Sequence, residues 1–410
     1  MPDVLKVENI EKINNKITVY FSADGEWSKY IKNNKIENTY DENIESVPDS
    51  IAIIPLLCNI LPIAWVFDLK ISLTEIDEVF YDAIPKILSG YKKMYPKFDF
   101  GGSIEADKII KNKYMAKRVG VLFSGGVDAT TTAYRHMDEK PDIITILGSD
   151  IKLDDKEGIE NVNRFNKNFS DNHKLKYERI YSTFRTFIDE GKLQEDRRLK
   201  TNKYGWWHEF QHGIGLIGLV APLSYVRGYN TVYIASSYSE KMSGMYTCAS
   251  DPMIDNQLKY GSTITIHDGY ELTRQDKVKF ICGYIERYDT RPYIRVCWQS
   301  SGGNNCCHCE KCRRTYLAFL IEKTDPSNIG LNFNDAQKKS MIKTLKKRLK
   351  YKYYTEQIEL YKDMQDRFIK NYTAAETPKE LCWFRTIKIG EKKSPFYLKY
   401  IDAIKARMGR

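Results

Sequence analysis

The sequence lacks the features that mark secreted and membrane-spanning proteins. Its first residues, Met1-Pro-Asp-Val-Leu-Lys, have neither the charged start nor the apolar core of a secretion signal. The longest apolar run, residues 51–67, is interrupted by Pro55, Asn59 and Pro62 and is too short and too broken to span a bilayer comfortably. We predict a buried strand or loop there. We therefore expect a cytoplasmic protein with no membrane partner.

Composition places the chain among soluble globular proteins of more than one domain. Its 410 residues suffice for two or three domains with their own cores, and 42% hydrophobic with 29% charged residues fits that class. The net charge of +10, from 64 basic and 54 acidic residues, favours anionic partners. Nucleotides, acidic substrates and RNA all meet this condition.

The most informative stretch is residues 119–131, which read Val-Gly-Val-Leu-Phe-Ser-Gly-Gly-Val-Asp-Ala-Thr-Thr. The apolar start is typical of a strand inside a parallel sheet, the two glycines favour a tight turn, and the polar end opens a helix. Free N–H groups at a helix start attract phosphate. We therefore predict a pyrophosphate site made by Ser124, Gly125, Gly126, Asp128, Thr130 and Thr131.

This loop is neither a Walker A loop, which needs Gly-Lys-Ser/Thr, nor a dinucleotide fingerprint, which needs three spaced glycines. Ser-Gly-Gly-x-Asp directly after an apolar strand resembles the PP-loop of the ATP pyrophosphatases. The resemblance implies a Rossmann-like (HUP) fold and cleavage of ATP to AMP and pyrophosphate, usually by adenylating a substrate oxygen. It also implies that Ser124, Gly125, Gly126 and Asp128 hold the pyrophosphate and its Mg²⁺.

Strand and helix patterns alternate after residue 119, which predicts an α/β fold with a doubly wound parallel sheet. We expect strands at 143–148, 176–181, 231–237 and from 264, with helices at 157–172 and 213–226. Ligands of such sheets bind beyond the carboxyl ends of the strands, so Gly148 and Ser236 should flank the same crevice as Ser124. Gly148 would let an adenine approach the backbone. The glycines of the 213–226 helix should allow it to pack against the sheet.

We predict three regions in the chain. Residues 1–115 form an N-terminal α+β module, residues 116–325 form the PP-loop domain with its metal site, and residues 326–410 form a basic helical region. Residues 338–352 contain eight basic residues and no acidic one. This pattern predicts an amphipathic helix with a solvated basic face, and its alternative is a surface for RNA. The apolar stripe of this helix consists of Met341, Ile342, Leu345 and Leu349.

A capped helix is predicted at residue 273, where Thr273 and Asp276 form a capping pair. Arg274 and Lys277 would project from its first turn. Exposed basic residues of this kind usually form a solvated face. The PP-loop enzymes also place a phosphate-holding lysine here, and this resemblance implies that Lys277, and after it Arg274, joins Asp128 as a catalytic group.

A cysteine cluster is the second strong signal. Four cysteines spaced C-x8-C-x2-C-x2-C can close around a tetrahedral ion, and a zinc with four sulfur ligands is structural because no position stays open for water. An iron–sulfur cluster is the alternative. The spacing leaves Cys307 and His308 outside the ligand set. The predicted Zn²⁺ ligands are Cys297, Cys306, Cys309 and Cys312.

The loop and the cysteine spacing together resemble 7-cyano-7-deazaguanine synthase over roughly residues 117–320. This family converts a 7-deazaguanine carboxylate to a nitrile with ATP and ammonia. The chain departs from the family pattern at Ala129, at Cys307, and at residues 206–213, where Pro-Gly-Arg-Asn is absent. Residues 212–222 and Ser250-Asp-Pro, with the later His-Asp-Gly, resemble the epimerase of UDP-N-acetylmuramoyl-L-alanyl-L-glutamate.

The expected function is therefore ATP-dependent activation of a carboxylate, carried by a small molecule or by a protein. Adenylation opens both chemistries, and ammonia would attack the acyl-adenylate in the synthase. Two further alternatives stay open. One is a tRNA-thiolating enzyme, which Cys248 and the basic tail support, and the other is a nucleotide-binding component of an antiphage defence system. The expected cofactors are ATP, Mg²⁺ and structural Zn²⁺. We also expect two partners: RNA, bound at the basic tail, and a second copy of the chain in a homodimer.

Overall fold

A short apolar run forms β6 (Arg118–Leu122), the central strand of a five-stranded parallel block. In this computed structural model β6 pairs in parallel with β7 on one side and with β9 on the other. β8 continues the block beyond β7, and β11 continues it beyond β9. The order is therefore β11-β9-β6-β7-β8. The strands and the α/β class predicted from residue 119 onward are confirmed.

The structure describes residues 3–199, 204–297, 301–351 and 355–393. The contacts divide the chain into two units, one of Met1–Glu271 with Ser301–Gly303 and one of Leu272–Ser300 with Asn304–Arg410. The predicted boundaries after residues 115 and 325 do not coincide with this division. The strands of the first unit are β1 (Val4–Ile13), β2 (Lys16–Ala23), β3 (Lys35–Tyr40), β4 (Lys70–Asp77), β5 (Ser103–Ile110), β6, β7 (Asp142–Leu147), β8 (Tyr177–Ser182), β9 (Tyr229–Ala235), β10 (Lys259–Tyr260) and β11 (Thr263–Asp268).

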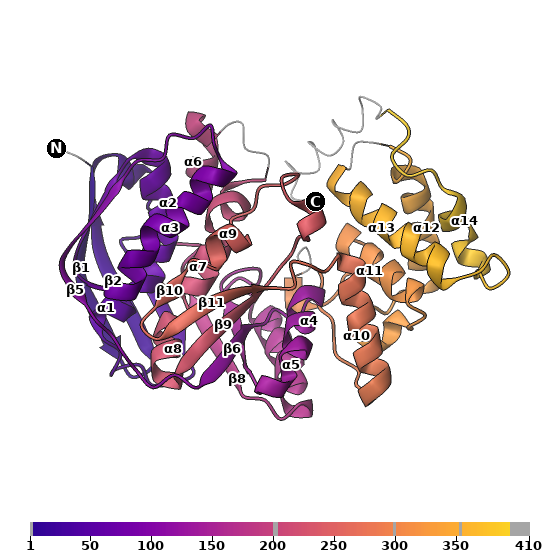
Figure 1. The fold of residues 1–410 in the computed structure, drawn as a ribbon, viewed down its shortest axis with the longest axis horizontal. Helices are drawn as coiled ribbons and strands as arrows, with labels where there is room; N and C mark the ends of the chain where they lie inside the picture. The colour runs from indigo at the N-terminus through magenta and orange to yellow at the C-terminus, as the bar shows by residue number, and fades with distance from the viewer. Residues whose placement is uncertain (1–2, 200–203, 298–300, 352–354, 394–410) are drawn as a thin grey trace. The chain divides into compact units, whose positions relative to one another are not determined.

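Helices cover both faces of the parallel block. α4 contacts β6 and β9, and α5 contacts β7 and β8, whereas α7 and α8 contact β9 from the opposite face (Figure 1). Between the block and the N-terminal strands lies a second group of helices that includes α1, α2 and α3. The helices of this unit are α1 (Asp49–Ala52), α2 (Ile54–Phe67), α3 (Glu78–Met94), α4 (Val127–Arg135), α5 (Lys156–Asn172), α6 (Glu190–Glu195), α7 (His212–Gly218), α8 (Ala221–Arg227) and α9 (Pro252–Asp255).

The N-terminal strands extend the same sheet. β3 pairs antiparallel with β8, and Tyr40 lies opposite Ile180. The sheet then continues through β2, β1, β4 and β5, which gives eleven strands in all. Residues 1–115 thus share their sheet with the parallel block that follows, and one core contains residues from both parts.

The prediction of a strand or loop at residues 51–67 is wrong, because this segment forms α1 and α2. Every residue of α2 is buried. A helix buried on all sides carries an unbroken apolar sequence, which by periodicity alone looks like a buried strand. Pro55 lies in the first turn, where a helix needs no backbone N–H donor, so it does not oppose the helix. Pro62 lies inside the helix.

The glycine-rich segment 213–226 forms two helices, α7 and α8, rather than one. Its glycines pack mainly against α2 and residues 249–255, which corrects the expected packing against the sheet. A Cβ atom on Gly215 would lie 2.6 Å from the Asn59 amide oxygen, and one on Gly218 would lie 2.4 Å from the Cys58 Cβ. α7 is therefore held against α2 at a distance that only glycine allows.

The second unit is helical. α10, α11 and α13 contact one another, and the Gln275 side chain donates to the backbone oxygen of Ala318 at 3.0 Å. The predicted amphipathic helix is confirmed as α12, with Met341, Leu345 and the following Leu349 buried and Ile342 half-buried. Lys352 and residues 394–410 of the predicted basic region lie outside the described residues. Its helices are α10 (Arg274–Tyr288), α11 (Glu310–Ile321), α12 (Asp335–Arg348), α13 (Thr355–Asn371) and α14 (Cys382–Thr386).

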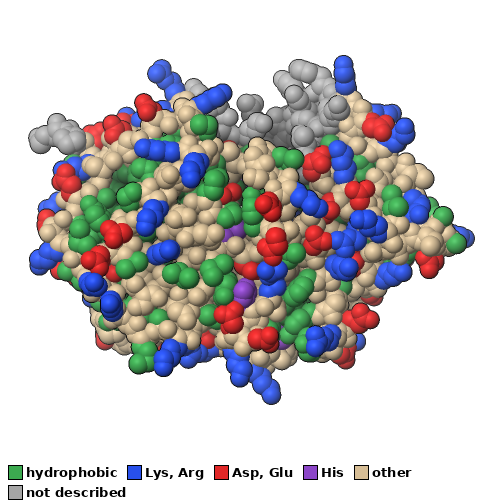
Figure 2. All heavy atoms as spheres, viewed as in Figure 1, with side chains coloured by type: hydrophobic (Ala, Val, Ile, Leu, Met, Phe, Trp, Pro, Cys, Tyr) green, Lys and Arg blue, Asp and Glu red, His purple; other side chains and the backbone are tan. Residues whose placement is uncertain are grey.

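Within the described ranges, none of the helices has both the length and the apolar sequence that crossing a membrane requires. Basic and acidic side chains are interspersed over much of the face shown in Figure 2.

Two glycine substitutions test the packing of α7. Gly218→Ala should lower the free energy of unfolding by about 1–3 kcal/mol, because its methyl group has to displace Cys58 in a filled core. Gly283→Ala in α10 should instead raise it by about 0.5–1 kcal/mol, because nothing lies within 4 Å of the added methyl group. Urea unfolding followed by circular dichroism measures both. Equal stability of the Gly218→Ala variant and the unmodified chain would contradict the close approach of α7 to α2.

Candidate nucleotide site and metal centre

The predicted strand–turn–helix is confirmed at the end of β6. Ser124 is exposed, and Gly125 has φ +75°, in the left-handed region that favours glycine. Gly126 caps the start of α4, and its N–H donates to the Ser124 hydroxyl at 3.3 Å. The first turn of α4 follows at once, so this loop presents a helix start whose leading N–H groups have no partner within the helix.

The loop lies where the order of the strands reverses. The chain runs from β6 outward to β7 and β8, and later returns to β9 and β11 on the other side of β6. Because these strands are parallel, their carboxyl ends share one edge of the sheet, and the reversal beside β6 is where such sheets bind ligands. Ser124, Gly148 and Ser236 follow β6, β7 and β9, which are adjacent strands. The predicted loop, Gly148 and Ser236 therefore share that edge.

Gly148 and Ser236 each have a structural role at this edge. Gly148 has φ +99°, and a Cβ atom on it would lie 2.0 Å from the backbone oxygen of Ser182, so the neighbouring strand already requires glycine. The Ser236 N–H donates to the Asp268 backbone oxygen at 2.8 Å. Its hydroxyl donates to the Tyr238 backbone oxygen, which holds the next loop against β9.

The polar residues that open α4 differ in their surroundings. Asp128 lies half-buried in the first turn. Thr130 and Thr131 are buried, and the Thr131 hydroxyl donates to the Val127 backbone oxygen at 2.9 Å, which uses the hydrogen that a phosphate would accept. The Thr130 hydroxyl is buried without a hydrogen-bond partner among the described residues.

Asp268 was not predicted, yet it fixes the helix that begins at the loop. It ends β11, and its carboxylate accepts hydrogen bonds from Thr132 at 2.8 Å and from Arg135 at 3.3 Å, while His136 Nε2 lies 3.1 Å away. Burial raises the pKa of Asp268, but the bonds with His136 and Thr132 and the Arg135 charge lower it more, so the net pKa is below its ordinary value. The only sequence signal was its place in the His-Asp-Gly stretch.

A buried polar group on the opposite face of β11 was also missed. His267 Nδ1 lies 2.7 Å from the Asp255 carboxylate, which also accepts the Ser250 hydroxyl at 2.8 Å. All three residues are buried. Burial raises the pKa of Asp255 above its ordinary value, although His267 and Ser250 oppose the rise. These bonds tie the segment before β10 to the sheet edge.

Cys248 begins that segment and is buried. Its sulfur lies 3.8 Å from His212 Nδ1, and burial raises the pKa of the thiol to about 12. A thiol with such a pKa is protonated at neutral pH and is a poor nucleophile.

The remaining predicted catalytic residues belong to the second unit, whereas Asp128 belongs to the first. The capping pair at the start of α10 is confirmed: Thr273 Oγ1 accepts the Asp276 N–H at 3.2 Å, and the Thr273 N–H donates to the Asp276 carboxylate at 3.1 Å. Arg274 is half-buried and Lys277 is buried on the first turn of this helix.

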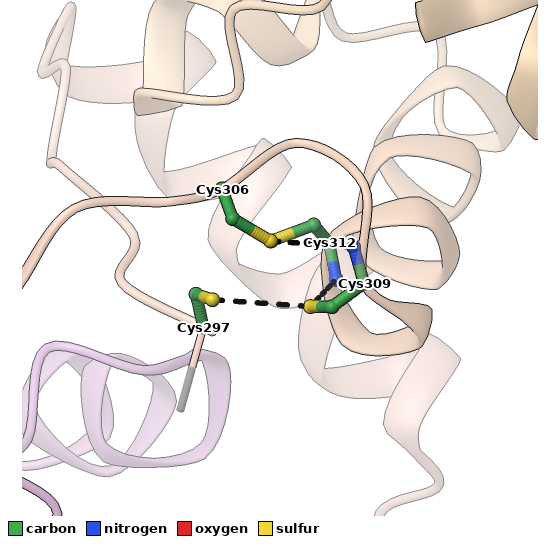
Figure 3. Close-up of side chains that lie close together, drawn as sticks. All are labelled: Cys297, Cys306, Cys309 and Cys312. Carbon is green, nitrogen blue, oxygen red and sulfur yellow. Dashed lines mark hydrogen bonds between the residues drawn. The ribbon is translucent and has the colours of Figure 1, made fainter. Parts of the chain in front are cut away.

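The four predicted cysteine ligands come together in the second unit (Figure 3). Their sulfur atoms all lie within 4.8 Å of one another, and the Cys306–Cys312 and Cys297–Cys309 pairs are each 3.9 Å apart. Sulfurs at about 2.3 Å from a tetrahedral zinc would be about 3.8 Å from each other. The spacing of the donors therefore fits a zinc ion.

The local chain conformation prepares these sulfurs for a cation. Cys309 caps α11, and its sulfur accepts the Cys312 N–H at 3.4 Å, while the Cys306 sulfur accepts the Cys309 N–H at 3.3 Å. Backbone N–H donors of this kind stabilise thiolates. His308 Nδ1 lies 2.8 Å from the Cys306 backbone oxygen and is exposed, and neither it nor Cys307 belongs to the four-sulfur group, as predicted.

Comparison with known proteins assigns no relative: the chain matches no model of a protein family and no curated protein.

Metal analysis tests the cysteine centre. The purified chain should contain one zinc ion per molecule, and Cys309→Ser should lose it because three sulfurs leave the tetrahedron open. Cys382→Ser is the matched control, since Cys382 is exposed and outside the group. Elemental mass spectrometry with a visible spectrum measures both. Iron with visible absorption would show the iron–sulfur alternative, and equal zinc in both variants would contradict the assigned ligands.

Titration of His136 tests the Asp268 network. Burial lowers the pKa of His136, but Asp268 and Glu139 raise it more, so we expect an NMR pKa above 6.5. Asp268→Asn should bring this pKa down. The ion pair between His136 and Asp268 stabilises the fold most between pH 3.8 and 6.5. Its contribution to stability is lost as pH rises through the raised pKa of His136. The contribution is also lost as pH falls through the lowered pKa of Asp268. An unchanged His136 pKa in Asp268→Asn would contradict the network.

Proposed function

We propose that this chain is an ATP-dependent enzyme that activates a carboxylate by adenylation and releases pyrophosphate. The observation that carries the proposal is the Ser-Gly-Gly-Val-Asp loop between β6 and α4, at the reversal of strand order. A sequence that resembles a PP-loop thus occupies the position where a sheet of this order binds a nucleotide. Within the proposal, the parallel block is a PP-loop fold of the Rossmann-like (HUP) type.

The proposed reaction needs positioned charge rather than a protein nucleophile. A carboxylate oxygen of the substrate attacks the α-phosphorus of ATP, the new acyl–phosphate bond forms, and the bond to the β-phosphate oxygen breaks. Negative charge grows on the departing pyrophosphate, where the Ser124 hydroxyl and the N–H groups of the loop would donate hydrogen bonds. Asp128 offers carboxylate oxygens, the ligands that Mg²⁺ prefers, and bound Mg²⁺ would neutralise phosphate charge. The phosphate role of Lys277, and of Arg274 after it, rests on the sequence resemblance.

The loop after β9 favours a flat substrate. Tyr238 and Tyr246 stack with their ring centroids 5.3 Å apart, and both are partly exposed. His208 meets Tyr238 edge-on at 6.0 Å. Aromatic rings beside the sheet edge can bind a planar heterocycle by stacking. We therefore place a heterocyclic carboxylate such as 7-carboxy-7-deazaguanine first among the substrates, with ammonia as the acceptor.

The burial of Cys248 argues against a tRNA-thiolating enzyme. A persulfide-carrying cysteine has to reach its sulfur donor and the nucleic acid, and it reacts as a thiolate. Cys248 is buried, and its pKa is raised to about 12. Carboxylate activation needs no such residue.

A pyrophosphate-release assay with ATP and Mg²⁺ tests the proposal. The substrates are 7-carboxy-7-deazaguanine with and without ammonia, UDP-N-acetylmuramoyl-L-alanyl-L-glutamate, and bulk tRNA. We expect release with the first, and a loss of roughly 10²–10³-fold in kcat for both Ser124→Ala and Asp128→Asn. Ser124→Ala removes a hydrogen-bond donor to the pyrophosphate, and Asp128→Asn removes a carboxylate ligand for Mg²⁺.

Asp138→Asn is the matched control, since Asp138 is exposed just beyond the far end of α4 and should keep full activity. Binding of ATP without turnover of any of these substrates would contradict the proposed enzyme for them. A cellular effect that survives Asp128→Asn would favour a nucleotide-binding scaffold instead.

A further inference from the structure

The second unit contains a basic cavity that the proposed reaction does not use. Its volume is about 370 Å³, which is within the range of small-ligand sites. One wall is the end of α12 with Lys346 and Lys350, and the other is the segment from Trp383 to Lys392. Two backbone bonds hold these walls together, from the N–H of Gly390 to Leu349 and from the N–H of Lys392 to Lys350, each 2.8 Å.

The charge of this cavity is strongly positive. Four lysines and one glutamate line it, which gives a net +3. Glu391 pairs with Lys388 at 3.6 Å. Among the described residues no carboxylate lies within ion-pair distance of the other three lysines, Lys346, Lys350 and Lys392. Uncompensated lysines around a concavity attract a ligand that carries several negative charges.

Trp383 adds an aromatic face to the same cavity. The Lys346 ammonium lies 5.9 Å from its ring centroid, and the ring is partly exposed. Proteins bind single-stranded nucleic acid with two elements: basic side chains that contact the phosphates and aromatic rings that stack on the bases. Lys346 and Trp383 supply both in this cavity.

The basic surface continues along α12 beyond the cavity. Basic and acidic side chains are interspersed over much of the face shown in Figure 2, but residues 338–351 include no acidic residue. The lysines of this run are exposed in the described residues, and α12 has 14 residues, which makes it about 21 Å long. A single nucleotide would fill the cavity, but it would leave most of this surface without an anion. The exposed lysines are Lys338, Lys339, Lys343, Lys346, Lys347 and Lys350.

We propose that the second unit binds single-stranded nucleic acid, with one base against Trp383 in the cavity and the neighbouring phosphates along the lysines of α12. The sugar–phosphate chain supplies the repeated negative charge, and an unstacked base supplies the planar face. This site is independent of the adenylation reaction, because none of its residues belongs to the loop after β6.

Fluorescence anisotropy with labelled oligonucleotides of about 20 nucleotides, a length that exceeds the site size of most single-strand binders, tests the proposal on the full chain. The probes are oligo(U), oligo(dT), a duplex of the same length and UMP as competitor. Lys346→Glu with Lys350→Glu should weaken binding at least tenfold. It should also flatten the slope of log K against log salt by about 1.4, which is 0.7 for each lost phosphate contact.

Lys279→Glu with Lys370→Glu is the matched control. Both lysines are exposed on helices of the same unit and outside the cavity, and the change in net charge is identical. Trp383→Leu should weaken binding about fivefold to a hundredfold, as the loss of one stacked base does, and leave the salt slope unchanged. Comparison of oligo(U) with oligo(dT) shows whether the strand is RNA or DNA.

Four results would overturn the proposal: absence of binding to both single strands at low salt, equal losses in the cavity and control pairs, duplex binding as tight as single-strand binding, or displacement by UMP at the oligonucleotide's own concentration. Urea unfolding of each variant separates a binding defect from a folding defect. Pyrophosphate release by the Lys346→Glu/Lys350→Glu variant distinguishes failure of this site from failure of the proposed reaction.

Discussion

The order of the five parallel strands is the constraint on which the candidate site depends. β6 lies between β7 and β9, and the chain leaves it in one direction and returns on the other side. The helices after β6 and after β9 therefore begin on different sides, and the edge beside β6 is left for a ligand. The Ser-Gly-Gly loop follows β6 directly and leads into α4, so it lies at this point of the edge.

The end of β11 fixes the helices on both faces of that sheet. Successive residues of a strand point to opposite faces. Asp268 is bonded to Thr132 inside α4 and lies beside His136 just after the end of that helix, whereas His267, one residue earlier, bonds Asp255 at the end of α9. The bonds of Asp268 to Thr132 and of His267 to Asp255 are buried, so breaking either would leave a polar group without water. The position of α4, and with it the geometry of the loop, thus depends on a strand far away in the sequence.

The sequence predicted those parts of the fold that local patterns determine. Alternating apolar runs located the strands of the parallel block, Thr273 with Asp276 located the start of α10, and the cysteine spacing identified all four sulfurs. Each of these signals spans fewer than about 20 residues, within which propensity and capping act directly.

The features that the sequence did not predict depend on long-range contacts. Pairing of β3 with β8 joins segments about 140 residues apart, so residues 1–115 read as a separate module. α2 is apolar on all sides, so its sequence shows no helical periodicity of apolar and polar residues. The glycines of α7 indicate close packing, but the sequence does not say that α2 is the helix they pack against. Apart from the His-Asp-Gly resemblance, no local pattern marked His267 and Asp268 as the residues that hold α9 and α4. Only the folded sheet shows what each of them holds.

The most direct test of carboxylate adenylation is the fate of an ¹⁸O label. 7-Carboxy-7-deazaguanine labelled in its carboxylate would be incubated with the chain, ATP, Mg²⁺ and ammonia, and the nucleotide product would be analysed by mass spectrometry. Adenylation followed by breakdown of the acyl-adenylate predicts AMP that carries one ¹⁸O atom from the carboxylate. ADP as the product, or AMP without the label, would contradict the account.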